Sequence, residues 1–407
     1  MQLSKSKLFP LEGHVQHYAW GGVSFLPRLL HLPNPDNQPF AEYWMGAHDN
    51  GDSALILNSG EKESLRAYID FFKNETLGSV VTGRFGRLPY LLKILDVKDM
   101  LSIQVHPSKK NAEEEFAEEN ERGIALQAAD RNYKDDNHKP ELMVALSEFW
   151  LLHGFKPMPF LRKTISGVKE FEFLLKEADK GYAELYRRVM EMPQEEVNKI
   201  LQPVLDRIMP PYKEGKLKKQ QEDFWAARAA TIFNQSGKID RGIFSIYFFN
   251  LLNLRPGQAI FQDAGVPHAY LEGQNIEIMA NSDNVLRGGL TSKYISVGEL
   301  MKHIRFEATD PELVQEIKSN THTTSFETPA PDFELNKIEL SKGEIFNGVA
   351  HSAQIYFLLS GRLTVTENEG FLFGRSAGQA WICFDQAKFT LEAEENSTLF
   401  FAKVPDA

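Results

Sequence analysis

Short apolar runs lie on both sides of one long stretch that has a helical pattern. Runs such as SALILNS and LPYLLKIL in residues 1–110, and IYFLLSGRLTV and STLFFAKV in residues 321–407, are separated by segments rich in Gly, Pro and Asn. Their length suits strands better than stable helices. Because many short strands joined by such turns favour a barrel or a jelly roll, we expect a mainly β chain.

The helical pattern occupies residues 157–235. In MPQEEVNKILQPVLDRI the apolar residues recur at helical spacing and share one face. Pro193 suits the start of this helix, and Pro203 should kink or divide it. The segment 209–221 resembles an exposed loop, and strands should return after residue 240 with GIFSIYFFNLLNL. The sequence therefore predicts a helical insertion between two strand-rich regions.

We divide the chain into four regions, which are residues 1–155, the helical insertion 156–240, a second strand-rich region 241–320, and a C-terminal region 321–407. A faint internal repeat links the last two regions, because Gly-Gln-Ala occurs at 257–259 and again at 378–380. The same offset sets Phe389 against His268. If the two regions are repeats, the first carries the chemistry and the second has lost it.

Composition excludes several classes of protein. The net charge of −11 argues against general nucleic-acid binding, although a local cationic pocket can coexist with an acidic exterior. The only cysteine, Cys383, allows no intrachain disulfide and no Cys-based zinc site, which suits a reducing compartment. The N-terminal segment MQLSKSKLFPLEG lacks a signal-peptide core, and no apolar run approaches the ~18 residues of a membrane span. We therefore expect a cytoplasmic protein.

Four polar residues in strand-and-turn contexts form a candidate metal site. Gln104 and His106 are two positions apart in IQVHP, so their side chains share one face of a strand. Glu141 follows a proline in HKPE, and His268 follows one in VPHAY. Two imidazoles, one carboxylate and one amide oxygen suit zinc and would leave a net charge of about +1 at the site. A single histidine beside a proline is more often structural, and there is no short H-x-H or HExxH motif.

Several cationic residues form a second candidate group. Lys93 lies inside the apolar run LLKIL, where it is either functional or a strand-edge side chain that reaches solvent. Lys139 adjoins the metal candidates, and Lys293 follows the LRGG turn. Arg287 could form a plain ion pair with Asp283, but the two glycines after it suit a turn that lines a ligand.

Five ordered motifs together resemble the type I phosphomannose isomerases of the cupin superfamily. They are YAWGG (18–22), AEYWMGAHD (41–49), LLKILDVKDMLSIQVHP (91–107), NHKPELMVAL (137–146) and GVPHAYLEGQNIEIMANSDNVLRGGLTSK (265–293). The resemblance implies cupin-type jelly-roll barrels. Residues 1–155 and 241–320 would form a catalytic barrel, residues 321–407 a degenerate C-terminal barrel, and residues 156–240 an α-helical domain.

The resemblance also implies a zinc enzyme of mannose and GDP-mannose metabolism. It would interconvert mannose 6-phosphate and fructose 6-phosphate through an enediol or enediolate. One Zn²⁺ per chain would be bound by Gln104, His106, Glu141 and His268. The implied catalytic residues are Arg287, Lys139, His138 and Asp283, with Asp283 as a base or as the residue that orients His138. The implied substrate-binding residues are Lys93, Ser102, Lys293 and Trp20.

The expected partner is a small phosphorylated sugar, with no nucleic acid and no membrane, and the chain should be a monomer or a weak homo-oligomer. Two other functions remain open. An iron-dependent cupin dioxygenase also uses two histidines and one carboxylate. A non-catalytic sugar-phosphate sensor could use the same scaffold. There is no P-loop or Rossmann fingerprint, which argues against a fused nucleotidyltransferase.

Overall fold

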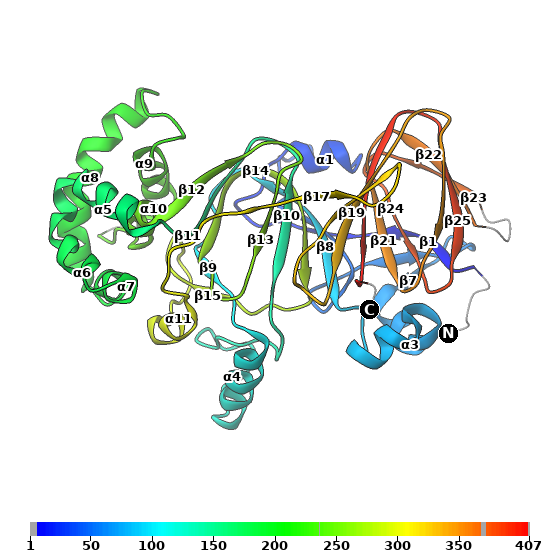
Figure 1. Ribbon diagram of the computed structural model, residues 1–407, viewed down its shortest axis with the longest axis horizontal. Coiled ribbons are helices and arrows are strands. Elements are labelled where there is room, and N and C mark those ends of the chain that lie inside the picture. Colours follow the sequence, from blue (N-terminus) through cyan, green and yellow to red (C-terminus); the bar gives the residue numbers. More distant parts are fainter. Residues whose placement is uncertain (1–5, 236, 368–371, 406–407) are drawn as a thin grey trace.

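Strands dominate the computed structural model, which describes residues 6–235, 237–367 and 372–405. Two β-rich bodies lie side by side, and a group of helices covers one end of the molecule (Figure 1). Residues 1–5, which belong to the N-terminal segment considered above for a signal peptide, lie outside the described residues. No helix in the described regions of the chain is both long enough and apolar enough to cross a membrane.

An eleven-stranded sheet carries all of the metal-ligand candidates or the residues next to them. Its main path is β16 (Leu313–Val314), β13 (Ala259–Gln262), β10 (Glu141–Ala145), β14 (His268–Ala280), β8 (Tyr90–Val97), β3 (Glu42–Met45) and β2 (His14–Gln16). Off this path lie β11 (Phe149–Phe155), β12 (Phe249–Leu254), β9 (Gln104–Val105) and β15 (Leu286–Arg287).

The long strand β14 changes partners at Gly273. Its first half pairs with β11 and β9, and its second half pairs with β8 and β10. Gly273 has φ of 132°, and a Cβ there would lie 2.6 Å from the carbonyl oxygen of Glu148. Only glycine fits this bend without strain. The bend lets one strand contribute side chains to two walls of the same site.

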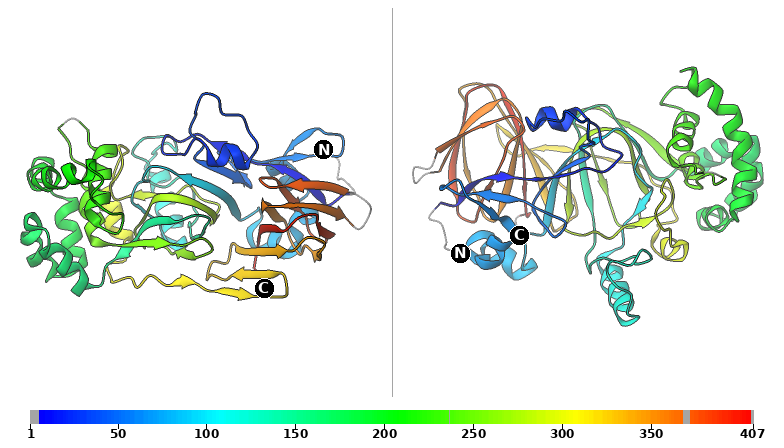
Figure 2. Two further views of the ribbon diagram at one scale, coloured as in Figure 1. Left: turned by 90° about the horizontal axis from the view of Figure 1, so that it is seen from above. Right: turned by 180° about the vertical axis from the view of Figure 1, so that it is seen from behind.

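A nine-stranded sheet unites the beginning and the end of the chain. Its order is β17 (Glu316–Lys318), β18 (Thr323–Phe326), β19 (Glu334–Leu340), β26 (Ser397–Lys403), β21 (Gln354–Ser360), β24 (Ala380–Cys383), β1 (Leu8–Glu12), β6 (Ala54–Ile56) and β7 (Lys62–Ser64). Seen from above, the N-terminal strands lie against the C-terminal ones (Figure 2). The sequence division at residue 155 does not anticipate this pairing.

The remaining strands form two smaller sheets. One has the order β20 (Ile345–Val349), β25 (Lys388–Ala393), β22 (Arg362–Glu367) and β23 (Leu372–Ser376), and the other pairs β4 (Ala47–His48) with β5 (Gly51–Asp52). An apolar core that contains Tyr356, Trp381 and Phe389 packs between the four-stranded and nine-stranded sheets. Phe389 thus serves as a core residue in the C-terminal region.

The repeated Gly-Gln-Ala segment folds into the same turn in both places. Gly257 and Gly378 have φ of 88° and 83°. Each following glutamine accepts a hydrogen bond through its side-chain oxygen from a backbone N–H three residues earlier, at 2.8 Å for Gln258 and 2.9 Å for Gln379. The turns lead into β13 and β24 respectively. The short sequence repeat therefore marks a repeated local structure.

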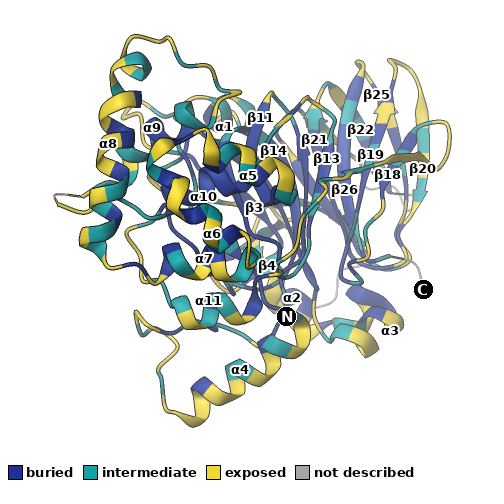
Figure 3. Ribbon diagram, turned by 60° about the vertical axis from the view of Figure 1, so that its left-hand side comes forward, coloured by how far each residue is buried: buried dark blue, intermediate teal, exposed yellow. Residues whose placement is uncertain are grey.

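The helices of residues 158–248 form a separate layer at the left of Figure 1. They are α5 (Met158–Ser166), the 3-10 helix η1 (Lys169–Leu174), α6 (Leu175–Ala178), α7 (Tyr182–Met190), α8 (Gln194–Lys213), α9 (Glu222–Phe233) and α10 (Gly242–Phe248). Their exposed faces point outward and their buried faces point into the molecule (Figure 3). Elsewhere lie α1 (Phe25–Leu29), α2 (Leu65–Phe71), α3 (Lys73–Phe85), α4 (Lys109–Glu121) and α11 (Val297–His303).

The helical region differs from the sequence expectations in three places. Pro203 does not divide helix α8, and this helix extends to Lys213 into the segment expected to be a loop. Its row of buried apolar residues packs in the helical core and offsets the loss of a backbone hydrogen bond at Pro203. Gly242–Phe248, which was expected to be a strand, is a helix buried on all sides. A fully apolar run does not distinguish a buried helix from a buried strand.

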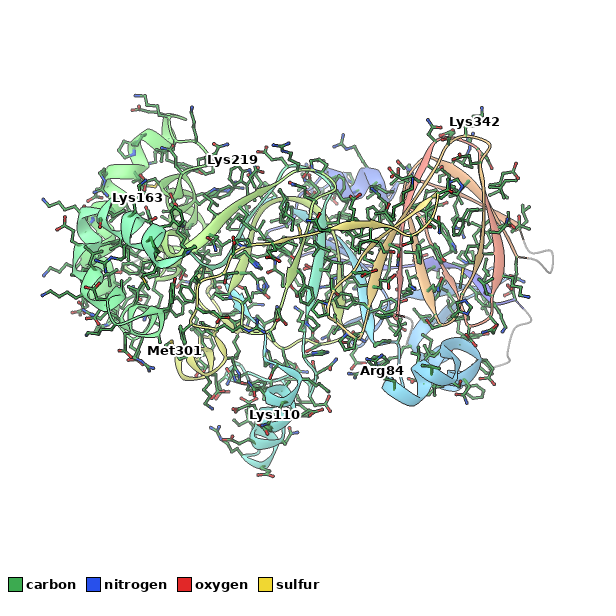
Figure 4. All side chains as sticks on the ribbon, viewed as in Figure 1. Arg84, Lys110, Lys163, Lys219, Met301 and Lys342 are labelled. Atoms are coloured by element: carbon green, nitrogen blue, oxygen red, sulfur yellow. The ribbon has the colours of Figure 1, made fainter. Side chains whose placement is uncertain are left out.

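Charged side chains lie mainly on the outer surface, as Lys163 on the helical layer and Lys342 at the far end of the molecule illustrate (Figure 4). One group of charged side chains, on or next to strands of the eleven-stranded sheet, lies in the interior instead. It contains Lys93, Lys139 and Glu141, which are all buried. Buried charges require close partners. This buried charged group is therefore the candidate functional site.

Candidate metal centre and active site

Strand register brings the metal-ligand candidates together. His268 at the start of β14 pairs with Gln104 on β9, and Gln104 pairs in turn with Arg287 on β15. Directly paired residues of antiparallel strands project to the same face of the sheet. Gln104 and His268 line one small cavity together with Glu141 from β10. Residues far apart in the sequence thus share one site.

Three side chains converge with metal-ligand spacing. One ligand atom each from His106, Glu141 and His268 lies within 4.8 Å of the other two. Nε2 of His106 lies 3.4 Å from Oε1 of Glu141, and Nε2 of His268 lies 3.4 Å from Oε2. The two imidazole centroids are 5.1 Å apart. All three residues are buried.

Hydrogen bonds to backbone carbonyls fix which ring nitrogens carry protons. Nδ1 of His106 donates to the carbonyl of Asn284 at 2.8 Å, and Nδ1 of His268 donates to that of Val266 at 3.0 Å. A neutral imidazole that donates through Nδ1 presents a lone pair at Nε2. Burial lowers the pKa of His106 to about 4, so that its ring is neutral at pH 7. Nε2 of His106 is buried and has no hydrogen-bond partner among the residues that the structure describes.

The site therefore fits a divalent cation. Two imidazole lone pairs face a carboxylate, and acceptors facing one another in a buried site repel unless a positive charge lies between them. The backbone carbonyls that hold Nδ1 orient both rings as the outer partners of metal-binding histidines do. The donor set of two nitrogens and one carboxylate, with an amide oxygen from Gln104 nearby, suits zinc-type coordination.

Lys139 neutralises some of the charge on Glu141. Its Nζ lies 2.9 Å from Oε1 of Glu141. Burial favours the neutral carboxyl, but the pKa of Glu141 is held well below its usual range, and the positive charge of Lys139 is the largest cause that opposes burial. Glu141 is thus an anion at neutral pH, as a metal ligand must be.

A second charged group lines the same cavity, which has a volume of about 50 Å³. Nζ of Lys93 lies 3.3 Å from Glu42 and 3.4 Å from Glu277, and it also lies 5.0 Å from the centroid of the Trp44 ring. Burial lowers the pKa of Lys93, but the two carboxylates outweigh burial and raise it. Lys93 is therefore a paired interior cation and does not reach solvent as a strand-edge side chain would.

Glu277 has a distinct environment within this group. The hydroxyl of Tyr270 donates to its Oε2 at 2.8 Å. Burial, followed by repulsion from Glu141, raises the pKa of Glu277 to about 7. Sequence reasoning missed Glu42, Tyr270 and Glu277. The alternation in NIEIMA was a usable signal, because it places Glu277 on one face of a strand between apolar neighbours.

Arg287, which was predicted to be catalytic, and the predicted substrate-binding residues occupy varied positions. Arg287 is half-buried, and burial lowers its pKa. Burial and the charge of Arg287 both lower the pKa of Lys293, an exposed residue. Ser102 is partly buried just before β9, and Trp20 is partly buried with its ring stacked on Tyr18 at a centroid distance of 5.9 Å. Arg287 and Lys293 thus form a cationic edge beside the site.

His138 and Asp283 have other partners. Nε2 of His138 lies 2.7 Å from Oδ2 of Asp332, which connects it to the C-terminal region. Asp283 lies 3.5 Å from Nε2 of His48 and accepts a hydrogen bond from the amide of Asn50 at 2.7 Å. No hydrogen bond joins Asp283 to His138, and no ion pair joins it to Arg287, among the described residues. Asp283 lines a separate cavity of about 560 Å³.

Within the described part of the chain, one other cluster has metal-ligand spacing, formed by Glu115, Glu299 and His303. Its polar atoms already have partners. The Tyr133 hydroxyl contacts both Glu299 and Nε2 of His303, at 3.0 Å and 2.7 Å. Lys302 pairs with both glutamates. These contacts connect α4 to α11 as an internal hydrogen-bond network.

Comparison with known proteins places the chain in one family. The family model for the phosphomannose isomerase type I catalytic domain matches residues 8–158. The mannose-6-phosphate isomerase of Salmonella typhimurium is 37% identical over 380 residues, covering 92% of this chain and 94% of the relative. The human mannose-6-phosphate isomerase is 34% identical over 367 residues, covering 83% of each chain.

Solved structures agree. A zinc-bound mannose 6-phosphate isomerase matches with a TM-score of 0.88 and 33% identity, covering 98% of this chain and 100% of that one. The Salmonella typhimurium enzyme bound to fructose 6-phosphate and zinc matches with the same TM-score, identity and coverage. This strand-rich chain with several helices belongs to the type I phosphomannose isomerase family of mannose-6-phosphate isomerases.

Proposed function

We propose that the chain is a zinc-dependent aldose–ketose isomerase that interconverts mannose 6-phosphate and fructose 6-phosphate through an enediolate. The observation that carries the proposal is the convergence of His106, Glu141 and His268, whose acceptor atoms face one another beside a buried acid–base group. The zinc and fructose 6-phosphate in the solved relative support the choice of metal and substrate.

In this proposal Gln104, His106, Glu141 and His268 bind one Zn²⁺ per chain. Because Gln104 is neutral, Glu141 is the only anion among the four ligands, and a net charge of about +1 remains. Zinc, when bound, supplies an electrophile that stabilises negative charge on the substrate oxygens. The remaining work belongs to side chains of the protein.

The isomerisation moves one proton between neighbouring carbons. A base removes the proton from C2 of the aldose and returns it to C1, while the hydroxyl proton moves from O2 to O1. We assign the base to Glu277, which lies in the cavity and is hydrogen-bonded to Tyr270 and paired with Lys93. A carboxylate so placed can accept and return a proton without contact with bulk water.

Cationic residues would handle the phosphate and the developing charge. We propose that Arg287 stabilises the enediolate or the substrate oxygens, because its planar fork suits paired oxygens. Lys293 and Ser102 would contact the phosphate group, and Trp20 would pack against the sugar. Lys93 would bind the substrate at the end of the cavity where its ammonium group is paired with Glu42 and Glu277.

Ring opening needs an acid or a base at the ring oxygen. Lys139 is our first choice, because it lines the cavity beside Glu141. His138 and Asp283 remain candidates for proton transfer from positions outside that cavity, each acting through a partner on another segment.

We further propose that the strands form cupin-type barrels. Residues 1–155 and 241–320 would supply the catalytic barrel, residues 156–240 the helical domain, and residues 321–407 a degenerate barrel. The repeated turns at Gly257 and Gly378 support a common origin for the two barrels. Among the described residues, the groups with metal-ligand spacing include none from the C-terminal region.

A coupled assay tests the function. Fructose 6-phosphate formed from mannose 6-phosphate would be converted to glucose 6-phosphate and oxidised by a dehydrogenase, with zinc-loaded and chelator-treated protein compared side by side. We expect flux only with the zinc-loaded protein. Mannose 6-phosphate binding without flux would indicate a sensor instead, and oxygen consumption with Fe(II) would indicate a dioxygenase.

A further inference from the structure

A row of polar side chains crosses four neighbouring strands at the metal centre. Arg287 on β15 pairs with Gln104 on β9, Gln104 pairs with His268 on β14, and His268 pairs with His153 on β11. Because direct partners of antiparallel strands project to the same face, His153 continues the row that begins with the arginine. His153 is buried, with 5% of its surface exposed.

A second short row approaches from the opposite wall. Glu141 on β10 pairs with Gln262 on β13, so these two side chains also share a face. Nδ1 of His153 lies 2.7 Å from Oε1 of Gln262, and this contact joins the two rows. With the 3.4 Å contact between Glu141 and His268, two side-chain contacts and two strand pairings link the four residues.

The side-chain amide of Gln262 is hydrogen-bonded through its oxygen but not, among the described residues, through its nitrogen. It is fully buried, and its Nε2 has no hydrogen-bond partner. Buried donors are rarely left unpaired, and an apolar side chain of the same size would pack here without that penalty. The amide is joined to His153 through its oxygen, so its N–H group stays unpaired among the described residues, on a side chain that shares a sheet face with Glu141.

We propose that His153 and Gln262 are positioning residues of the metal centre, which hold the strands that carry His268 and Glu141 at the separation that a divalent cation needs. Neither residue binds the ion. His153 stands beside one ligand and Gln262 beside the other, and the hydrogen bond between them fixes the separation of the two walls. Outer partners of this kind set ligand geometry and metal affinity. The inference rests on the proposed zinc site.

The test uses Gln262→Met, which keeps the volume and removes the amide. Zinc affinity is measured on the full-length protein by competition with a chromogenic chelator. Asn336→Leu is the matched control, because Asn336 on β19 is also a buried amide. Its oxygen accepts a hydrogen bond from Ser325 at 2.7 Å, and its Nδ2 has no partner. We expect zinc affinity to fall about 10- to 100-fold in Gln262→Met and to stay unchanged in the control.

Two histidine variants test the same hydrogen bond from its other end. His153→Leu should weaken zinc binding as Gln262→Met does, and it decides the question if the Met variant does not fold. His153→Asn, whose amide can replace the Nδ1–H donor, should restore most of the affinity. The visible absorption of bound cobalt(II), which reports ligand geometry, should change in the Leu and Met variants and return towards wild type in His153→Asn.

The outcomes separate this inference from the proposed function. Wild-type protein that binds no zinc would overturn both. Wild-type protein that binds zinc, together with folded Gln262→Met and His153→Leu variants of wild-type affinity and cobalt spectrum, would overturn the positioning role alone. Equal losses in Gln262→Met and Asn336→Leu would also overturn it, because the effect would then follow from general destabilisation.

Discussion

Nε2 of His106 and Oε1 of Glu141 lie 3.4 Å apart in the protein interior, with the proton of the neutral imidazole on the far side of its ring. Two acceptors at this distance repel each other in a medium of low polarity. The backbone carbonyl of Asn284 maintains the arrangement, because it accepts only from Nδ1–H. The fold thus keeps these two acceptors close together in spite of their repulsion, and a cation bound between them would remove that repulsion.

Zinc should therefore stabilise the protein strongly. At a free zinc concentration near 1,000 times the dissociation constant, we expect the free energy of unfolding to rise by about 4 kcal/mol. Thermal unfolding with and without a chelator measures this difference. The Glu141→Gln variant is the control and should gain much less from zinc. Equal gains in both proteins would show that the ion binds elsewhere.

Replacement of Gln104 by glutamate should separate metal binding from turnover. The added carboxylate keeps a ligand oxygen but cancels more of the charge of the ion, so we expect zinc to remain bound and turnover to fall about 10-fold or more. Metal analysis and the coupled assay provide the two measurements. Gln104→Leu should instead lose zinc. Full turnover in zinc-loaded Gln104→Glu would contradict the charge argument.

Acid should destabilise the metal-free protein through His106. Its pKa is lowered from 6.5 to about 4 by burial, so between these values the unfolded state binds more protons. Stability from the neutral ring is therefore complete above pH 6.5 and is lost as the pH falls towards 4, by about 3 kcal/mol in total. Urea unfolding across this range measures the slope. His106→Gln should show a shallower slope, and identical slopes would exclude His106 as the cause.

Glu277→Gln should abolish most turnover while zinc binding persists. Loss of a positioned base typically lowers kcat by about 10²- to 10⁴-fold. Glu42 still pairs with Lys93 in this variant, so the lysine keeps one carboxylate partner. Tyr270→Phe removes only the hydrogen bond to Glu277 and should have a smaller effect. Near wild-type kcat in Glu277→Gln would assign proton transfer to another residue.

Arg287→Ala should lower turnover by about 10²-fold or more without loss of zinc, because in the proposed function the guanidinium stabilises charge on the substrate and does not bind the metal. Zinc content and steady-state kinetics are measured on the same sample. Arg287→Lys keeps the charge but loses the planar fork and should recover some of the activity. Intact zinc with near wild-type turnover in Arg287→Ala would remove this residue from the mechanism.

Local pattern predicted many elements because it reflects local physics. The structure confirms the helical face of Val197–Ile208, and it confirms a turn at each Gly-Gln-Ala segment. The failures occurred where packing decides. Gly242–Phe248 is helical because it is buried within the helical layer, and its all-apolar sequence carries no period that could reveal this.

The candidate site also combines features that the local sequence predicts with features that depend on packing. The four ligand candidates were found through their residue types and the family motifs, since no short spacing joins residues 104 and 268. Their contacts depend on the register of β9, β11 and β14 around the bend at Gly273. His153, Gln262 and Glu277 were missed for this reason, because each acquires a role only from the strand beside it.

The nine-stranded sheet has a consequence for biosynthesis. β1 hydrogen-bonds to β24, where Leu8 pairs with Cys383, so during synthesis on the ribosome β1 waits for a strand that lies more than 300 residues later in the sequence. Until then the edge of β1 that will pair with β24 is open to other chains, as exposed strand edges are in any incomplete sheet. A premature stop codon between residues 269 and 380 would leave the N-terminal strands without this partner and create an aggregation-prone product, although every metal-ligand candidate would still be present.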